Sequence, residues 1–240
     1  MKRLSFRDPL SEVYLRNNQI IRKINKKEKF FFENLFKDDF YKKMTNDNWI
    51  QKSEINYNEN QTEITHEKIN NFTEVTEMSS YQLFLSGMHT LNIAITSLKN
   101  GYMLKDASAW NVVFYNGNPL FLDIGSFQKW NEEKTWIGYG QFIRHYLIPL
   151  ILNKELKIPV SKLFLTDRDG VYPKNAKNKL GLKVFKSLKY LEFILAPSMI
   201  KSASINIKKE NSSNSEINQR ILLTILGRLR KKLLSLEPLA

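Results

Sequence analysis

The segments LKDASAWN at residues 104–111 and LFLDIG at residues 120–125 decide how this 240-residue chain is interpreted. Asp106 precedes Asn111 by five residues, and Asp123 follows Asn111 by twelve. Between the two segments lies Asn-Gly-Asn, which is typical of a tight hairpin turn. Carboxylate and amide oxygens are ligands of Mg²⁺. Because a hairpin brings its two ends together, the spacing predicts that the three side chains converge on one site.

This spacing is close to that of the phosphoryl-transfer machinery of protein kinases, where an Asp, an Asn and the Asp of an Asp-Phe-Gly element act together. The similarity implies that Asp106 receives the proton of an acceptor hydroxyl, that Asn111 and Asp123 bind Mg²⁺, and that Lys105 stabilises the transferred phosphoryl group. Each residue also has a structural alternative. Asp106 could form an Asx-turn with Ser108, Asn111 could satisfy loop backbone, Asp123 could be a salt-bridged structural carboxylate, and Lys105 could be a solvated surface cation.

Composition excludes several classes of function. The chain has no cysteine and only three histidines, which are far apart, so thiol catalysis and Cys- or His-based metal sites are not expected. It has neither a signal-like N-terminus nor a run long enough to span a bilayer, and we expect a soluble cytoplasmic protein. The formal charge is +13, but the basic residues are dispersed, which disfavours nucleic-acid binding and equally suits a polyanionic substrate such as ATP.

Hydrophobic periodicity predicts a strand-containing first part and a helical second part. Two hairpins are expected, around residues 17–18 and 116–118, and short strands near Ile50 and Ile64. The predicted helices are 29–44, 79 or 80 to 99, 136–152, 180–195 and 217–236, with a Ser/Asn-rich linker at 211–215. The aromatic residues expected to pack in the core are Trp110, Trp136, Tyr139 and Phe142.

These elements predict an α+β, protein-kinase-like fold with a small strand-containing N-lobe at 1–75 and a larger helical C-lobe at 76–240. The hinge is expected at 73–80. The catalytic loop is expected at 104–111 and the metal-binding segment at 120–127. These loops would face the cleft between the lobes.

The chain further resembles kinase-like domains that are fused to S-adenosylmethionine-dependent methyltransferases in bacteria. The resemblance extends over roughly residues 6–172. Besides the two opening segments, it rests on FRDP at 6–9, IRKIN at 21–25 and the pattern Trp-x-x-Tyr-x-Gln-Phe with a later Pro-Leu at 136–150. The chain contains no Gly-rich S-adenosylmethionine loop, so we expect a freestanding version or a fragment, and no methyl transfer by this chain.

A cation of the N-lobe is expected to contact the nucleotide phosphates in place of the kinase β3 lysine. Strand alternation allows Arg22 or Lys23 to point into the cleft, but not both, and the resemblance favours Arg22. Glu33 would pair with that cation, and Glu28 competes for the role. The first strands carry no Gly-x-Gly-x-x-Gly loop, so phosphates cannot be cradled in the usual way.

Two classes of function remain open. The first is a phosphotransferase that uses ATP and Mg²⁺ on a small-molecule, glycan or protein acceptor, with nucleotidyl transfer as a variant. The second is a non-catalytic kinase-like module that binds a nucleotide or a partner such as a methyltransferase. The intact Asp/Asn/Asp triplet favours the enzyme, whereas the missing Gly-rich loop favours the module. No motif identifies the acceptor or the oligomeric state.

Overall fold

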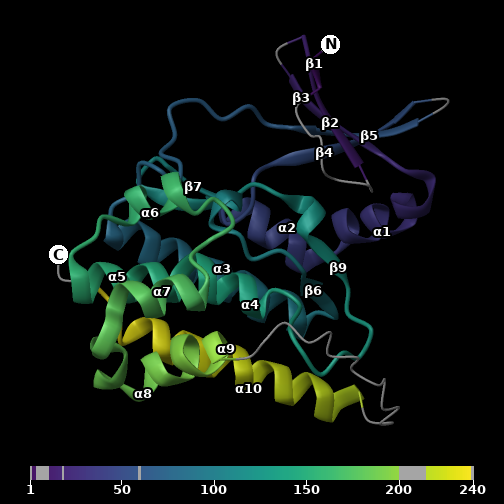
Figure 1. Ribbon diagram of the computed structural model, residues 1–240. Helices are drawn as coiled ribbons and strands as arrows, with labels where there is room; N and C mark the ends of the chain where they lie inside the picture. Colours follow the sequence, from purple (N-terminus) through teal and green to yellow (C-terminus); the bar gives the residue numbers. More distant parts are fainter. Residues whose placement is uncertain (1, 4–10, 18, 59–60, 200–214, 239–240) are drawn as a thin grey trace.

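A computed structural model describes residues 2–3, 11–17, 19–58, 61–199 and 215–238 of the chain. Its N-terminal part is a five-stranded antiparallel sheet in the order β1-β2-β3-β5-β4 (Figure 1). The strands are β1 Lys2–Arg3, β2 Ser11–Arg16, β3 Gln19–Ile24, β4 Ser53–Asn58 and β5 Gln61–His66. The first predicted hairpin is confirmed as β2 and β3, and Asn17 at its turn has a φ of 49°, a conformation that asparagine tolerates. Asn18 and the FRDP segment lie outside the described residues.

Two helices follow β3 where periodicity predicts one. α1 spans Lys26–Lys37 and α2 spans Asp39–Asn46. The chain breaks at Asp38, which is extended and whose carboxylate accepts a hydrogen bond from the Phe40 N–H at 3.2 Å. Asp38 is therefore the N-cap of α2. The prediction missed the break because both helices turn their apolar side chains toward the same core.

One of the two strands expected in the polar segment is present. Ile64 lies in β5, whereas Ile50 precedes β4 and forms an isolated bridge to Phe121. The Gln51 N–H donates to the Phe121 carbonyl at 2.8 Å, and the Phe121 N–H donates to the Trp49 carbonyl at 3.0 Å. These bonds attach the N-terminal part directly to a hairpin of the helical part.

The long helix α3, Ser80–Lys99, begins at a capping box formed by Ser79 and Gln82. It ends before Gly101, whose φ of 77° suits glycine. Four short strands follow: β6 Tyr102–Leu104, β7 Val112–Tyr115, β8 Asn118–Phe121 and β9 Phe127–Lys129. β7 pairs with β8 and β6 pairs with β9, which confirms the second predicted hairpin and returns residues 122–126 to the start of the loop at 104–111.

The rest of the described chain is helical. The predicted helix 136–152 starts later, at Tyr139, and runs through α4 Tyr139–Phe142, a π-helical segment Ile143–Leu147 and α5 Ile148–Leu156. The predicted single helix 180–195 is wrong, because Gly181, with a φ of 53°, ends α7 and a 3-10 turn at Gly181–Lys186 follows. The remaining elements are α6 Val160–Thr166, α7 Pro173–Leu180, α8 Leu188–Tyr190, a second π-helical segment Leu191–Leu195, α9 Ala196–Met199 and α10 Ser215–Leu234. α10 confirms the last predicted helix, and the expected linker lies outside the described residues except for Ser215.

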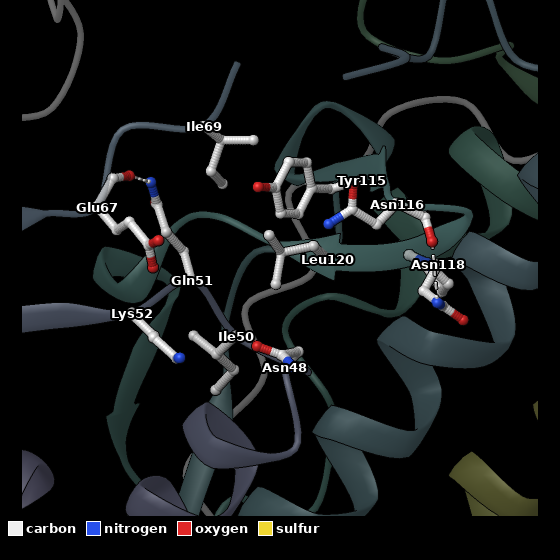
Figure 2. Close-up of a pocket in the computed structure, with 11 residues that line it drawn as sticks. Asn48, Ile50, Gln51, Lys52, Glu67, Ile69, Tyr115, Asn116, Asn118 and Leu120 are labelled. Carbon is white, nitrogen blue, oxygen red and sulfur yellow. Dashed lines mark hydrogen bonds between the residues drawn. The ribbon is translucent and has the colours of Figure 1, made fainter. Parts of the chain in front are cut away.

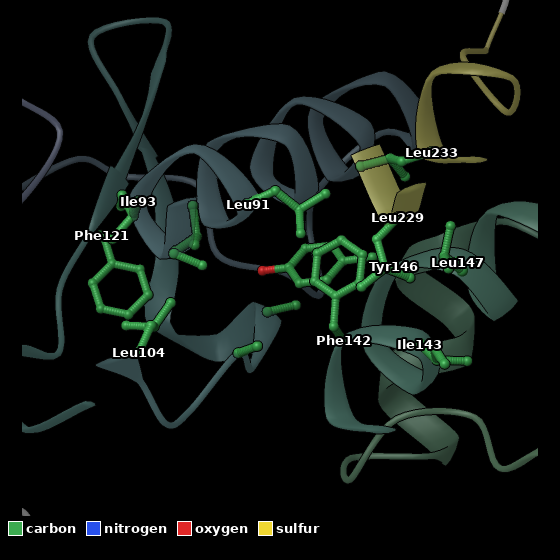
Figure 3. Close-up of a cluster of buried hydrophobic side chains, with 14 of the residues drawn as sticks. Leu91, Ile93, Leu104, Phe121, Phe142, Ile143, Tyr146, Leu147, Leu229 and Leu233 are labelled. Atoms are coloured by element: carbon green, nitrogen blue, oxygen red, sulfur yellow. The ribbon is translucent and has the colours of Figure 1, made fainter. Parts of the chain in front are cut away.

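The core of the helical part lies between α3, the α4–α5 helix and α10 (Figure 3). Tyr146 is fully buried at its centre, next to Phe142, Leu91 and Leu229. A Cβ at Gly87 would lie 3.0 Å from both Leu233 and Tyr146, so α3 and α10 are in close contact there. No helix in the described ranges combines the length and the apolar character needed to cross a membrane.

The predicted fold class is confirmed by the order of the elements. An antiparallel sheet with helices after its third strand leads through a long helix into two hairpins that hold the 104–111 and 120–127 segments, and a helical part follows. This is an α+β, protein-kinase-like architecture.

Candidate functional site

Asp123 is the centre of the candidate site. It follows β8 directly, at the start of a 3-10 turn over Ile124–Ser126, and its side chain is 29% exposed. Its Oδ1 accepts hydrogen bonds from the Gly125 N–H at 3.0 Å and from Arg22 Nη2 at 2.5 Å. Its Oδ2 accepts a hydrogen bond from Ser126 Oγ at 2.8 Å. The carboxylate is therefore held in place by its own turn and by the N-terminal sheet.

Arg22 reaches Asp123 from the middle strand of the sheet. In β3 it pairs with Val13 on one side and with Ile64 on the other, and its side chain is 9% exposed. A Cβ at position 125 would lie 2.5 Å from Arg22 Nη1. Gly125 is thus the residue that lets the guanidinium approach the turn.

Asn111 is linked to Asp123 through a serine hydroxyl. Asn111 Nδ2 donates to Ser126 Oγ at 3.2 Å, and the same hydroxyl donates to Asp123. The Asn111 carbonyl also accepts the Leu122 N–H at 2.8 Å. Since the amide nitrogen is used toward Ser126, the amide oxygen is the atom that Asn111 can offer to a ligand.

Asp106 lies on the neighbouring loop, one residue after Lys105. Its Oδ1 accepts the Ser108 N–H at 2.9 Å, which is the Asx-turn considered above as its structural role. The Lys105 N–H donates to the Ser126 carbonyl at 2.7 Å, so the start of the loop is fastened to the turn that follows Asp123. The backbone of the loop at 104–111 is therefore joined to the turn at 124–126, and the convergence of the three side chains stays a prediction.

Side chains of α4 and of the π-helical segment that follows it bind the backbone of the loop at 104–111. Gln141 Oε1 accepts the Ala107 N–H at 2.8 Å, and His145 Nδ1 accepts the Ala109 N–H at 3.3 Å. The Tyr146 hydroxyl lies 3.5 Å from the Ser108 carbonyl and 3.0 Å from Thr90 Oγ1 of α3. Consecutive backbone groups of the loop are thus bound by side chains of α4 and of the π-helical segment.

Burial is the main cause of the lowered pKa values of two histidines, His66 and His145. The pKa of His66 is lowered to about 4, mainly by burial and then by the Arg22 guanidinium, while Asp123 acts in the opposite direction. His66 is therefore neutral at pH 7, and its Nδ1 lies 2.8 Å from Ser53 Oγ. Burial likewise lowers the pKa of His145 to about 4, with Arg144 acting in the same direction. Since His145 is neutral, its Nδ1 can accept the hydrogen bond from the loop.

Two predicted residues lie apart from this group. Lys23 points to the opposite face of β3, where its ammonium lies 4.9 Å from the centre of the Tyr14 ring. Glu33, on α1, has its carboxylate 3.8 Å from Lys29 Nζ and near the Tyr57 hydroxyl, whose pKa is raised mainly by burial and then by Glu33. The carboxylate that the structure brings to Arg22 is that of Asp123.

The donor set at Asp123 and Asn111 suits Mg²⁺. Both offer hard oxygen ligands, which this ion prefers, and Mg²⁺ is commonly bound by one or two protein groups together with substrate phosphates and water. Within the described residues, no group of three or more His, Cys, Asp or Glu side chains could hold a metal ion. A metal at this position would therefore depend on oxygen atoms supplied by a ligand.

A separate cavity of about 280 Å³ lies near the tip of the β7–β8 hairpin (Figure 2). Ile50 and Leu120 contribute apolar surface to it, and Lys52, Glu67 and Tyr115 contribute polar groups. None of the predicted site residues lines it. The cavity and the candidate site are thus at opposite ends of one hairpin.

The fold is protein-kinase-like, and kinase domains are among the solved structures that are similar to this chain. The kinase domain of PknI from Mycobacterium tuberculosis is similar over 52% of this chain and 57% of its own, with 13% identity and a TM-score of 0.33. Vaccinia related kinase 3 is similar over 95% of this chain and 88% of its own, with 11% identity and a TM-score of 0.43.

Sequence comparison finds one curated protein with partial similarity. Nodulation protein NoeA of Rhizobium meliloti (strain 1021) is 25% identical over 152 residues, which is 63% of this chain. The chain spans about a third of that protein, 32% of its length. No protein-family model matches the chain.

Sequence reasoning did not find every residue that builds the site. Gln141 and His145 support the loop, but their partners are backbone N–H groups, which carry no sequence signal. His66 is influenced by the charges of both Arg22 and Asp123, but nothing in the sequence of β5 indicates a neighbouring ion pair. Trp136 and Phe142 are buried as predicted, and the Trp136 indole donates to the Leu104 carbonyl at 2.6 Å.

Proposed function

We propose that the chain is a kinase-like phosphotransferase that uses ATP and Mg²⁺ to phosphorylate a small-molecule, glycan or protein acceptor. The observation that carries this proposal is the Asn111–Ser126–Asp123 linkage with Arg22 placed across it. In this linkage hydrogen bonds connect an amide, a carboxylate and a guanidinium from three separate elements. Phosphoryl transfer requires mainly such positioning together with neutralisation of phosphate charge.

In this proposal Asp123 and Asn111 hold Mg²⁺, which neutralises charge on the phosphates when it is bound. Arg22 moves from Asp123 to a phosphate oxygen, because a guanidinium binds either anion. Lys105 stabilises the transferred group. Asp106 receives the acceptor proton through Oδ2, since Oδ1 is used by the Asx-turn.

The alternative is a non-catalytic module that binds a nucleotide or a partner, such as a methyltransferase. A specific observation favours it as well. Arg22 already supplies a positive charge to Asp123 at 2.5 Å, where a catalytic site would place the metal. A stable ion pair at this point would compete with Mg²⁺, and ATP binding would then be weak or independent of the metal.

Thermal unfolding with ATP, in the presence and absence of Mg²⁺, tests the nucleotide site. A ligand that binds only the folded state stabilises it by about 2.7 kcal/mol at a hundredfold excess over Kd. We expect ATP with Mg²⁺ to raise Tm and Asp123→Asn to remove most of the increase. Asp39→Asn is the matched control, because it removes one carboxylate charge from a side chain that is 99% exposed. An equal increase for the Asp123→Asn protein would exclude Asp123 as a metal ligand.

Asp106→Ala separates chemistry from binding. For an enzyme, the variant should bind ATP normally and lose about 10²–10⁴-fold in kcat, which is the usual contribution of a positioned general base. ATP turnover measured with candidate acceptors, alongside ATP titration, gives both quantities. A parent protein that binds ATP and transfers no phosphoryl group to any acceptor would identify the non-catalytic module.

A further inference from the structure

The segment after α7 carries an exposed apolar row beside a basic row. Leu182, Phe185 and Leu188 are 86%, 62% and 80% exposed. They are spaced by three, and in a 3-10 helix residues three apart lie above one another, so the turn at Gly181–Lys186 aligns Leu182 with Phe185. Leu188 stands three residues further along the sequence, at the start of α8 and after the extended residue Ser187. We call these three residues the apolar row.

Three lysines follow the same spacing one residue later. Lys183, Lys186 and Lys189 form what we call the lysine row. Lys186 Nζ lies 3.1 Å from Glu155 Oε2, Lys183 Nζ donates to the Glu155 carbonyl, and Lys189 Nζ donates to Ser235 Oγ at 2.7 Å. The row is thus anchored at its inner side to α5 and to the residue after α10.

Positive charge exceeds negative charge around this segment. Burial lowers the pKa of Lys189, and Lys154 and Lys232 lower it further, so the lysines repel one another there. Among the described residues, the acidic groups that contact these lysines are Glu155, whose side chain is 14% exposed, and Glu192, which pairs with Lys232 at 2.7 Å. Five lysines (Lys154, Lys183, Lys186, Lys189 and Lys232) thus stand against these two glutamates, so an incoming surface would meet a net positive charge around three projecting apolar side chains.

From this combination we propose that the apolar row and the lysine row together dock the protein onto an anionic lipid surface. The apolar side chains would enter the boundary between headgroups and acyl chains, and the lysines would contact acidic headgroups. The high exposure of all three apolar residues means that they project as knobs, whereas a site for a protein helix would be hollowed. A second copy of the chain fits poorly, because two such faces would bring their lysines together.

Docking through the face that carries the apolar row and the lysine row would not cover the candidate site. α8 lies at the end of the molecule opposite the N-terminal sheet (Figure 1). Docking through α8 would leave the sheet, and Arg22 with it, directed away from the lipid. The proposal does not depend on phosphoryl transfer, and its test needs no nucleotide.

Co-sedimentation of the full chain with vesicles tests the proposal. The vesicles are phosphatidylcholine alone or phosphatidylcholine mixed with phosphatidylserine. We expect binding to the mixed vesicles that weakens with added salt, and little binding to the neutral ones. Replacing the apolar row by serine should weaken binding about tenfold or more for each side chain. Replacing the lysine row by glutamine should weaken it about fivefold for each lysine.

Matched controls remove the same groups elsewhere. Phe30→Ser with Leu165→Ser takes away apolar side chains that are 74% and 72% exposed, and Gln in place of Lys26, Lys27 and Lys42 removes equal charge from α1 and α2. Both controls should bind the mixed vesicles within about twofold of the parent, since none of these groups belongs to the apolar row or the lysine row. Circular dichroism melts check that every variant is folded.

Three results would overturn the proposal. The parent could fail to bind the mixed vesicles. Alternatively, each variant and its matched control could lose binding equally, which would mean that binding is not specific to this face. Light scattering without lipid could also show a dimer that the apolar-row variant loses, which would make this face an interface between copies. Variants that unfold are replaced by Phe185→Ser alone, for which loss of vesicle binding supports the proposal and retention contradicts it.

Discussion

Replacing Gly125 by alanine would test whether the Arg22–Asp123 contact organises the site. The new Cβ would lie 2.5 Å from Arg22 Nη1, 3.2 Å from Arg22 Cζ and 3.1 Å from Asp123 Oδ1. The backbone of Gly125 has no positive φ, so alanine adds no backbone strain there. Relief of the contact requires the guanidinium to move, because it is the end of a long side chain. That movement lengthens the 2.5 Å bond to Asp123.

The expected loss of stability follows from the weakening of the hydrogen bond between Arg22 and Asp123. A hydrogen bond with charged partners contributes about 1.5–3 kcal/mol. Alanine recovers about 0.4–1 kcal/mol by restricting the unfolded chain. Since Arg22 is largely buried, water can replace the lost partner only in part. We therefore expect Gly125→Ala to lower the free energy of unfolding by about 1–2 kcal/mol.

Urea unfolding followed by tryptophan fluorescence measures this loss, and a double-mutant cycle assigns it. In an Arg22→Met background the clash is absent, so Gly125→Ala should cost less than about 0.5 kcal/mol. Gly140→Ala is the matched control, because its Cβ would meet only Arg144 Nη1 at an ordinary 3.5 Å. The same loss in both backgrounds would refute the reasoning, since the cost could not then arise from Arg22.

Acid should destabilise the fold as pH falls from 6.5 to about 4, because unfolded histidines bind protons in this range while His66 and His145, with folded pKa values of about 4, do not. At the acid end of this range each of the two histidines lowers the free energy of unfolding by about 3 kcal/mol. The urea midpoint should therefore fall less steeply with falling pH for His145→Gln than for the parent protein. Equal slopes would contradict a buried, neutral His145. Gly170→Ala should cost at least about 2 kcal/mol, because φ is +80° and the Cβ would lie 2.8 Å from His145 Cδ2. Gly101→Ala, with φ +77° and open space, should cost only about 1 kcal/mol, and equal urea midpoints for these two variants would show that the contact is harmless. Gly227→Ala, in the middle of α10 with nothing within 4 Å, should raise the free energy of unfolding by about 0.5–1 kcal/mol, and a loss would indicate unseen crowding.

Much of the site could be predicted because its parts are local in sequence. Asp106, Asn111 and Asp123 lie around one hairpin, and the Asn-Gly pair at its turn is a strong signal. The alternation of β3 limited the inward cation to Arg22 or Lys23. The partner of that cation was beyond prediction, since Asp123 is 101 residues away and either Glu33 or a phosphate could satisfy a cation equally well.

The helical part was predicted less completely, for identifiable reasons. Helices α6 and α7 begin at or beside Pro159 and Pro173, where short segments with few apolar residues give weak periodicity. The break at Asp38 and the 3-10 turn after Gly181 interrupt apolar patterns that continue on either side. Hydrophobic spacing reports which face is buried, and it does not report a local change in hydrogen-bond register.

The π-helical segment at Ile143–Leu147 is a local change of hydrogen-bond register that affects the contact between Gln141 and Ala107. A π-turn holds one residue more than the α-helical turn that it replaces. Deleting a residue from it would restore α-helical winding and rotate the preceding turn by about 100° relative to α5. Gln141 would then leave Ala107, although no residue of the loop had changed. The extra residue in this turn therefore sets which side chains of α4 can reach the backbone of the loop that carries Asp106.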